Sequence, residues 1–363
     1  MSRSPITRLK TLKKSRSILS GTKVSASWRS PSNIALVKYW GKKDGQIPLN
    51  PSVSMTLTRS YTLTSVEALV SGNQEFITVN GDAHHPFIQK INQFLRPLVK
   101  EIPVLGELSF RVKTINNFPH STGIASSASG FSAFVLCLLD IAEMVSGVKI
   151  LPEEFFSAAS FLSRLGSGSA CRSVYGGYSL WGETHLVPGS SDLFAVPVND
   201  RIHPSLKTLH DAILVISSNP KSLPSSRGHA LMEHHPFAVA RISQVKNNIS
   251  EILKAMDSGD IERLAGITEN EALTLHALIM SSDEGTILLK PSSINVISQI
   301  REARQKGLPV FFSLDAGPNV HLFYPEPAAG QVEQFISDEL EISCEKGSVI
   351  YDRCGSGPER QEI

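Results

Sequence analysis

Two segments of this 363-residue chain consist almost entirely of small residues. The first, residues 123–130, reads Gly-Ile-Ala-Ser-Ser-Ala-Ser-Gly and leads into an apolar stretch with helical spacing. Small side chains leave backbone N–H groups open to an anion, and the positive end of a following helix dipole points to the same place. The segment therefore predicts a polyphosphate site in which the hydroxyls of Ser126, Ser127 and Ser129 add donors or help to hold Mg²⁺. It is not a Walker A loop, because no Gly-Lys-Ser/Thr follows the glycines. A helix start packed tightly on a sheet is the structural alternative.

The second segment, residues 166–173, reads Gly-Ser-Gly-Ser-Ala-Cys-Arg-Ser. Its flexible backbone and hydroxyl donors lead to Arg172, whose planar guanidinium can bind a carboxylate or a phosphate through two hydrogen bonds. The alternative is a Gly/Ser-rich turn whose arginine forms a structural salt bridge. The sequence marks no partner base for Cys171, so we expect this thiol to be buried as a small apolar group rather than to act as a nucleophile.

Positive charge gathers at two further places. At the first, three lysines and two aromatic residues follow an apolar run, which favours an anionic ligand; a solvated strand end with a half-buried aromatic pair is the alternative. These residues are Lys38, Tyr39, Trp40, Lys42 and Lys43. At the second, Lys221 precedes a Ser-Ser-Arg sequence at 225–227 and either completes an anion pocket or belongs to a polar loop.

One acid stands apart from the other charged residues. Asp315 begins the turn 315–319 between two strongly apolar runs, 310–314 and 320–324, which we expect to be strands. A carboxylate held there is partly removed from water, which favours its neutral form unless a nearby lysine restores the charge. A base that acts on an alcohol needs such a placement. The alternative is an Asx turn in which Asp315 caps its own backbone.

The elements that must position these residues differ between the two halves of the chain. In the first half, residues 24–40, 54–66, 75–79 and 107–115 mix β-branched, aromatic and polar residues in near-alternation, which predicts an antiparallel sheet with a turn at Asn80-Gly81. A long helix follows the first Gly/Ser segment and should pack on that sheet. Its apolar residues are Phe131, Phe134, Val135, Leu138 and Leu139.

Past residue 200 the pattern becomes more helical. Residues 212–216 read as a buried strand, and two helical patterns follow. A further helix opens at Pro291 with a Ser cap and stops at Lys306-Gly307. Strands and helices are segregated rather than alternating, so we expect an α+β fold with a domain boundary near residue 200.

Composition bounds the class of protein. The length and 41% hydrophobic content predict two domains, or one large one, with a sizeable core. The net charge of +1 gives no footprint for nucleic acid or an anionic membrane. The four cysteines and eleven histidines form no metal-ligand spacing, and no apolar run approaches the roughly 18 to 20 residues that cross a bilayer. We therefore expect a soluble, cytoplasmic protein with reduced cysteines, whose basic stretch 3–23 is a flexible tail or else a targeting or interaction segment.

The chemical segments also carry a family resemblance. In order along the chain, residues 33–42, 123–128, 166–173 and 315–319 resemble the signature segments of the diphosphomevalonate decarboxylases, which belong to the GHMP small-molecule kinase superfamily. The resemblance implies a GHMP kinase fold, with an N-terminal domain like domain 2 of ribosomal protein S5, a ferredoxin-like C-terminal domain and an active site in the cleft between them. It divides the chain into an extension at 1–23 and domains at 24–203 and 204–363.

The resemblance also implies a reaction and its residues. The family uses ATP with Mg²⁺ to phosphorylate the 3-hydroxyl of mevalonate 5-diphosphate, then loses phosphate and CO₂ to give isopentenyl diphosphate. By position, Asp315 resembles the catalytic acid, Arg172 the arginine that grips the substrate carboxylate, and Lys38 an active-site lysine near both. Substrate contacts are implied for Tyr39, Lys42, Ser167, Ser169, Arg172, Ser226 and Arg227. ATP contacts are implied for Gly123, Ala125, Ser126, Ser127 and Ser129, with Ser127 also near the metal.

Two alternatives stay open from the sequence. The first is a related GHMP kinase or decarboxylase that acts on mevalonate or its monophosphate. The second is a catalytically silent protein that keeps the fold for binding or scaffolding, against which Asp315, Arg172 and Lys38 argue. Relatives of this family are commonly homodimers, so the resemblance also implies a homodimer.

Overall fold

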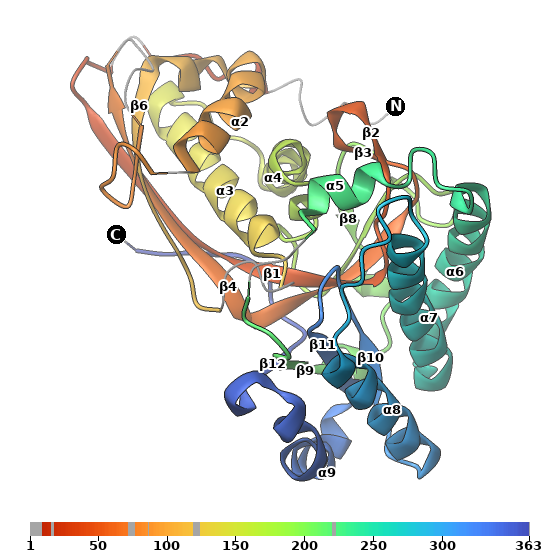
Figure 1. Cartoon of the computed structure of the whole chain (residues 1–363). Helices are drawn as coiled ribbons and strands as arrows, with labels where there is room; N and C mark the ends of the chain where they lie inside the picture. The colour runs from red at the N-terminus through yellow and green to blue at the C-terminus, as the bar shows by residue number, and fades with distance from the viewer. Residues whose placement is uncertain are drawn as a thin grey trace.

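The computed structural model describes residues 9–15, 18–71, 77–85, 87–118, 124–219 and 223–362; for Ser225 and Ser226 it describes the backbone alone. Two sheets organise this part of the chain (Figure 1). The larger sheet is built mainly from the first half and the smaller sheet from the second half. Helices are grouped against the sheets rather than alternating with strands, so the α+β prediction is confirmed.

The larger sheet runs in the order β13-β1-β4-β6-β5, with β7 on β4 and β8 on β7. Its strands are β1 (Lys23–Val37), β4 (Ser52–Val70), β5 (Ile77–Val79), β6 (Leu108–Asn116), β7 (Tyr178–Trp181), β8 (Ala195–Pro197) and β13 (Glu359–Arg360). The long strand β4 pairs with β7 near its start and with β6 near its end. The predicted antiparallel pairing holds except for β5, which lies parallel to β6 because the chain passes through a helix between them. A small hairpin of β2 (Lys42–Lys43) and β3 (Ile47–Pro48) follows β1.

Three helices cover one face of this sheet: α2 (Phe87–Glu101), α3 (Ser126–Ser146) and α4 (Pro152–Gly166). The predicted helix after the Gly/Ser segment is α3, and its Asp140 accepts a hydrogen bond of 2.8 Å from the buried indole of Trp28 on β1. By length and mean hydropathy α3 could cross a bilayer, contrary to our expectation that no such run exists. In this fold 83% of its 18-residue apolar stretch is buried, so α3 is the central helix of the N-terminal core.

The smaller sheet has the antiparallel order β10-β11-β9-β12. Its strands are β9 (His210–Leu214), β10 (Phe311–Ser313), β11 (Val320–Tyr324) and β12 (Val349–Arg353). The accompanying helices are α5 (Ser225–Ala230), α6 (Ala238–Ser258), α7 (Ile261–Met280), α8 (Pro291–Gln305) and α9 (Ala329–Phe335). Numbered from β9, the strand order is 2-3-1-4 with helices after the first and third strands, which is the ferredoxin-like arrangement.

One apolar core joins the two halves. It combines residues of β1, β4 and β7 with residues of β9, α6 and α7. At the same boundary the buried carboxylate of Asp352 on β12 accepts hydrogen bonds of 2.6–2.8 Å from three successive backbone N–H groups of β4, at Thr58, Arg59 and Ser60. The C-terminal sheet is thus fixed against β4, and the hairpin β10–β11 is brought to the end of β1.

Two expectations, one about the N-terminal segment and one about the start of α8, are wrong. Leu9 and Leu12 are fully buried in the N-terminal core, so the described residues 9–15 are a packed segment and not a flexible tail. Helix α8 starts at Pro291 as predicted, but its N-cap is Lys290. The hydroxyl of Ser293 accepts from the Lys290 backbone N–H at 3.2 Å, so the predicted serine acts one turn inside the helix.

Candidate active site

A cleft of about 820 Å³ collects most of the residues that the sequence singled out. Its walls include the end of β1, the start of α3, the segment 166–172, part of α5 and the tip of the β10–β11 hairpin. The predicted site residues on its lining are Lys38, Tyr39, Lys42, Ala125, Ser126, Ser127, Ser167, Ser169, Arg172 and Asp315. Segments almost 280 positions apart along the chain therefore meet in one space.

Lys38 and Asp315 form an ion pair across the two halves. The Nζ of Lys38 lies 3.0 Å from Oδ1 of Asp315 and donates a second hydrogen bond, of 2.7 Å, to the carbonyl of Ala35. The lysine side chain is 2% exposed, whereas that of the aspartate is 25% exposed. Burial lowers the pKa of Lys38, and the charge of Asp315 opposes that shift. The pair thus presents a carboxylate to the cleft and keeps its cation behind it.

Arg172 is buried beside this pair and held by two polar neighbours. Its Nε donates to Oδ1 of Asn33 at 3.3 Å, and its Nη1 donates to the hydroxyl of Ser52 at 2.6 Å. The Asn33 amide group donates in turn to Ser169 O and Ser173 Oγ, which fixes its oxygen toward the guanidinium. Burial lowers the pKa of Arg172, opposed by nearby groups that include Asp315. The guanidinium is therefore oriented before any ligand arrives.

The two Gly/Ser segments meet through their hydroxyls. Ser127 Oγ at the start of α3 lies 3.1 Å from Ser167 Oγ, which lies 3.4 Å from Ser169 Oγ. Ala125, the N-cap of α3, has a left-handed φ of 44°, and no side chain in the described part of the chain caps the helix. A Cβ at Gly168 would lie only 2.8 Å from the hydroxyl of Tyr39, so only glycine permits this approach. A helix N-terminus and a row of hydroxyls thus face the same cleft as Arg172, an arrangement that suits phosphate oxygens.

The strand end after Lys38 forms another wall. The ring of Tyr39 lies between those of Trp181 and His229, at centroid distances of 4.5 and 4.2 Å. Its buried hydroxyl has no hydrogen-bond partner within the described part of the chain, and burial raises the pKa of this hydroxyl. Lys42 donates to Gln46 at 2.8 Å, and burial lowers the pKa of Lys42. A ligand acceptor here would satisfy the buried phenol.

Several predicted residues lie elsewhere or outside the described residues. Ser129 is fully buried, and its hydroxyl lies 2.6 Å from that of Thr62 on the sheet side of α3. The side chain of Arg227 is 66% exposed, is absent from the cleft lining and pairs with Glu284 at 2.5 Å. Gly123 and Lys221 lie outside the described residues, and Ser226 is described by its backbone in α5 only. The ligand contacts inferred for these residues remain predictions.

Cys171 behaves as expected. It is fully buried, and burial raises the pKa of its thiol to about 12. A thiol in that state is protonated at neutral pH and is a poor nucleophile. Its neighbours Gly168 and Arg172, rather than the sulfur, face the cleft.

The sequence did not reveal the buried residues that hydrogen-bond to Arg172, Lys38 and Asp315. They are Asn33, Ser52, Arg241, Glu271 and His276. For the last three a signal existed, because each is a charged or titratable residue at a core-facing position of an amphipathic helix. Such residues are almost never fully buried without a partner.

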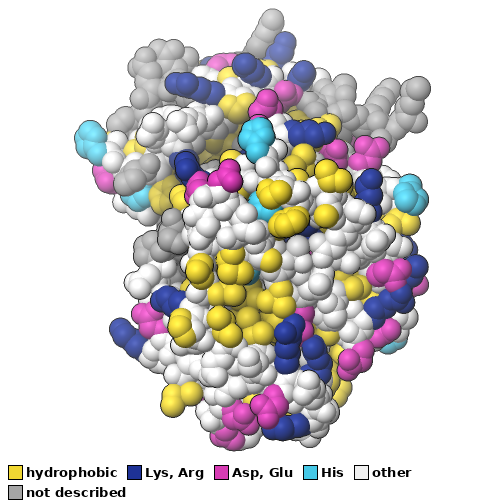
Figure 2. All heavy atoms as spheres, turned by 45° about the vertical axis from the view of Figure 1, so that its right-hand side comes forward, with side chains coloured by type: hydrophobic (Ala, Val, Ile, Leu, Met, Phe, Trp, Pro, Cys, Tyr) yellow, Lys and Arg dark blue, Asp and Glu magenta, His cyan; other side chains and the backbone are white. Residues whose placement is uncertain are grey.

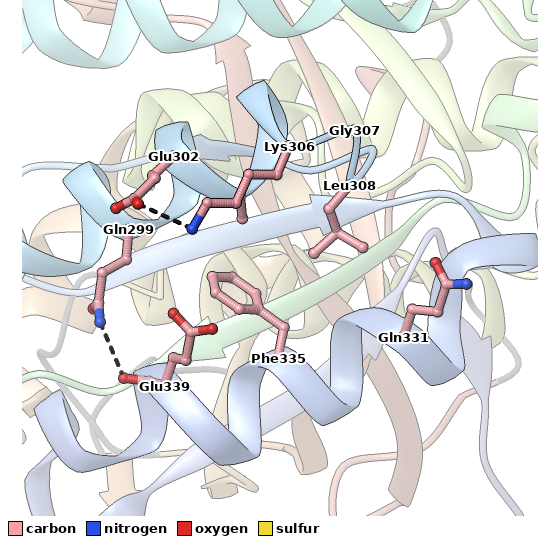
Figure 3. A pocket seen from close by; sticks show the side chains of 9 residues that line it. Gln299, Glu302, Lys306, Gly307, Leu308, Gln331, Phe335 and Glu339 are labelled. Atoms are coloured by element: carbon pink, nitrogen blue, oxygen red, sulfur yellow. Dashed lines mark hydrogen bonds and ion pairs between the residues drawn. The ribbon is translucent and has the colours of Figure 1, made fainter.

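A second, smaller pocket of about 310 Å³ lies between α8 and α9 (Figure 3). There Lys306 pairs with Glu302 at 3.0 Å, and Gln299 donates to the backbone carbonyl of Glu339 at 3.4 Å. Of the residues that the sequence predicted for catalysis or binding, none that the structure describes lines it. The larger cleft is therefore the candidate active site.

The comparisons with known proteins agree with this geometry. Residues 30–194 match the diphosphomevalonate decarboxylase-like N-terminal domain, and residues 212–359 match the mevalonate 5-diphosphate decarboxylase C-terminal domain. The diphosphomevalonate decarboxylase of Candida albicans is 33% identical over 318 residues, covering 83% of this chain and 84% of the relative. That of Saccharomyces cerevisiae is 32% identical, covering 84% of this chain and 78% of the relative.

Solved structures give the same result. The mevalonate diphosphate decarboxylase of Staphylococcus aureus superposes with a TM-score of 0.80 at 28% identity, covering 94% of this chain and 99% of the other. A structure of MDDEF in complex with MVAPP, AMPPCP and magnesium superposes with a TM-score of 0.78 at 27% identity, covering 94% of this chain and all of the other. Both neighbours therefore match the two halves of the chain in their observed arrangement.

Proposed function

The chain belongs to the diphosphomevalonate decarboxylase family, and from this premise we propose how its cleft converts mevalonate 5-diphosphate and ATP into isopentenyl diphosphate, ADP, phosphate and CO₂. One observation carries the proposal: the Lys38–Asp315 pair, the buried Arg172 and the N-terminus of α3, with serine hydroxyls beside it, line a single cleft. Phosphoryl transfer to an alcohol needs this combination of a base, cations and an anion site.

ATP places its phosphates at the start of α3. The backbone of Ala125, Ser126 and Ser127 supplies the donors there, and the sequence adds Gly123. The apolar arm of the cleft, lined by Phe87, Ile91, Val112, Phe131 and Phe134, accommodates the base. Hydrophobic and aromatic walls of this kind are typical of small-molecule sites.

The cleft residues can hold Mg²⁺ only when the phosphates of a bound nucleotide supply further oxygen ligands. Among the described residues no group of three or more His, Cys, Asp and Glu side chains could hold a metal, and Asp315 is the one described carboxylate on the cleft lining. Mg²⁺ usually keeps several waters and binds mainly through substrate phosphates, with few protein ligands. We assign the Ser127 hydroxyl as its protein contact, where the bound ion would neutralise charge on the transferred phosphoryl group.

The substrate lies between the cations. Arg172, oriented by Asn33 and Ser52, binds the carboxylate, with Ser167 and Ser169 beside it. Tyr39 and Lys42 bind the diphosphate, which supplies the acceptor that the buried Tyr39 hydroxyl lacks. This orientation leaves the 3-hydroxyl facing Asp315.

Asp315 then orients the 3-hydroxyl and accepts its proton as the oxygen attacks the γ-phosphorus. The new O–P bond forms while the bond from the γ-phosphorus to ADP breaks, and Lys38 offsets the charge that builds up beside Asp315. In the second stage the C3–O bond breaks and phosphate leaves. The electron pair of the C1–C2 bond forms the C2=C3 double bond, and CO₂ departs. Arg172 must release the carboxylate at this stage, so overly tight ground-state binding would slow the reaction.

The decisive experiment offers ATP and Mg²⁺ with mevalonate, mevalonate 5-phosphate or mevalonate 5-diphosphate, and measures ADP and CO₂. We expect both products in equal amounts with the diphosphate alone. ADP without CO₂ would indicate a kinase, and CO₂ from the monophosphate would indicate a related decarboxylase. No ADP from any of the three would revive the scaffold alternative.

We also propose a homodimer. Several large apolar side chains are exposed near the start of α6 and the end of α7, among them Phe237, Val239 and Met280. Figure 2 shows hydrophobic side chains gathered on this side of the molecule. Exposed apolar patches often mark protein–protein contacts. Light scattering coupled to size exclusion tests this, with Val239→Asp as the variant expected to be monomeric; a monomeric parent protein would exclude the dimer.

A cytoplasmic location completes the proposal. Its support is the state of the four cysteines, which are all free thiols, three of them buried. Reduced thiols are typical of cytosolic proteins. A fluorescent fusion of the full chain gives the test, and accumulation in an organelle would contradict this location.

A further inference from the structure

A single helix of the C-terminal half contacts the backbone on both sides of the Lys38–Asp315 pair. Glu271 of α7 accepts a hydrogen bond of 2.8 Å from the backbone N–H of Lys38. His276, five residues further along α7, has its Nε2 3.1 Å from the backbone carbonyl of Asp315. Both side chains are almost fully buried. The helix thus reaches two residues that lie 277 positions apart in the chain.

The Glu271 end of this arrangement is rigid. Its carboxylate receives two parallel hydrogen bonds from Arg241 of α6, of 2.7 and 2.6 Å, and a third of 2.6 Å from Asn248. The same guanidinium donates to the Lys38 carbonyl at 3.2 Å, and Asn50 donates to it at 2.9 Å. The N–H and C=O groups of Lys38 are therefore both held by buried partners. Such bidentate pairs add geometric specificity to their strength.

The His276 end is held by a neutral donor. A carbonyl only accepts hydrogen bonds, so Nε2 must carry the proton. Burial lowers the pKa of His276 to about 4, and the neighbouring Lys38 charge acts in the same direction. The ring is thus uncharged at neutral pH. It anchors the Asp315 backbone without adding a further cation to Lys38 and Arg172 near the carboxylate, which would weaken Asp315 as a proton acceptor.

We propose that His276 and Glu271 are positioning residues that set the separation between the Lys38 ammonium and the Asp315 carboxylate from one helix. Lys38 directly follows β1 of the N-terminal sheet and Asp315 lies in the turn of the C-terminal hairpin, so the relative position of the two halves decides their distance. Helix α7 contacts β1 and also β10, which ends two residues before Asp315, so a shift of this one helix would move both residues of the pair. The inference rests on the proposed function, because it concerns the reactive pair of that site.

The test compares two substitutions of His276 with the same two substitutions of His235. His235 is a matched control, because this buried histidine also has its Nε2 3.0 Å from a backbone carbonyl, but that carbonyl belongs to Leu278 and not to a residue of the reactive pair. We expect His276→Leu to lower kcat by about 100-fold while the KM for ATP and for mevalonate 5-diphosphate changes by less than about 3-fold, as for a displacement of about 1 Å. His276→Gln keeps an N–H donor and should recover at least about one tenth of the parent kcat. His235→Leu and His235→Gln should lower the Tm at most and leave kcat unchanged.

A second pair of variants covers Glu271. Because Glu271→Leu alone would leave Arg241 as a buried unpaired charge, that variant can fail to fold. The double variant Glu271→Leu/Arg241→Leu removes both charges, and we expect it to fold with a Tm near the parent value but with kcat lowered by about 10-fold or more. A parent-like kcat in this folded double variant, or in His276→Leu, would overturn the inference. So would equal losses of kcat in the His276 and His235 variants.

The parent protein keeps the two proposals separate. If the parent releases no CO₂ from mevalonate 5-diphosphate, the proposed function fails. If the parent is active and the His276 and double variants match it, only the positioning role fails.

Discussion

Lys38 contacts two acidic residues that differ in their access to solvent, one through its side chain and one through its backbone. Its side chain pairs with Asp315, of which a quarter of the side chain is exposed to the cleft. Its backbone is held by the Arg241–Glu271 pair, of which the side chains are 1% and 0% exposed. The first pair faces a space that admits a substrate. The second is closed off from solvent, and Asn248 and the Lys38 backbone add hydrogen bonds to Glu271, while the Nε of Arg241 has no partner in the described part of the chain.

The difference separates reactivity from support. A carboxylate that must take a proton from a substrate has to be accessible from the cleft, as Asp315 is. A charge pair that only fixes geometry is most stable when its buried groups have hydrogen-bond partners, because a buried unpaired group is costly. Substitutions that break one pair at a time should therefore change either catalysis or stability.

The largest effect should follow from Asp315→Asn. The amide keeps the size of the side chain but cannot accept the 3-hydroxyl proton, so we expect kcat to fall by about 10³-fold or more. Nucleotide affinity should stay within about 3-fold, because the phosphate loop lies on α3 and not on the hairpin. CO₂ release and titration with a fluorescent nucleotide measure the two quantities. Turnover near the parent value would remove Asp315 from the mechanism.

Breaking the closed pair should act on folding instead. Arg241→Leu leaves Glu271 buried without its cation, and we expect the free energy of unfolding to fall by about 3–5 kcal/mol. Urea denaturation followed by circular dichroism gives the value. The matched variant is Arg263→Leu, which removes the charge of an arginine on α7 whose side chain is 45% exposed and pairs with Glu251. A loss no greater than that of the control would mean that the closed pair is not a stability element.

Both members of the open pair could be identified from the sequence, whereas for the supporting residues of α6 and α7 the sequence indicated only that they need partners and not which partners they have. Asp315 stands in a turn between two short apolar runs, and local pattern alone placed it at a hairpin tip, where β10 and β11 have it. The same local pattern gave α3, because its apolar residues recur with helical spacing over a long stretch. Motifs defined by adjacent residues could therefore be identified without the fold.

The support depends on contacts between distant segments. Glu271 and His276 meet Lys38 and Asp315 only because α7 packs against the ends of β1 and β10, and no spacing along the chain encodes that. The parallel pairing of β5 with β6 escaped notice for a related reason, since α2 between them contains Pro97 and was not predicted. In the N-terminal segment, the many basic and hydroxyl residues suggested a flexible tail, although Leu9 and Leu12 are buried in the core.

A smaller effect should appear in the pH dependence of stability. Burial lowers the pKa of His276 to about 4 in the folded protein, while an unfolded histidine titrates near 6.5. Between these values the unfolded chain binds the extra proton, so stability is complete above about pH 6.5 and falls as the pH drops toward 4. The loss attributable to His276 reaches about 3 kcal/mol at the lower end. Urea unfolding from pH 7 to pH 4.5 should be less steep in pH for His276→Leu than for the parent, and identical slopes would contradict the assigned burial.

The smallest effect should come from an ion pair open on all sides. Lys306 and Glu302 lie 3.0 Å apart on α8, with side chains 72% and 64% exposed. Water and salt screen such a pair, and its ordering offsets most of its attraction. We therefore expect Lys306→Gln to leave both the Tm and kcat at the parent values at physiological salt, by differential scanning fluorimetry and CO₂ release. A clear loss of turnover would show that the pocket between α8 and α9 is coupled to catalysis in the cleft. The division into one reactive pair and one supporting pair would then be incomplete.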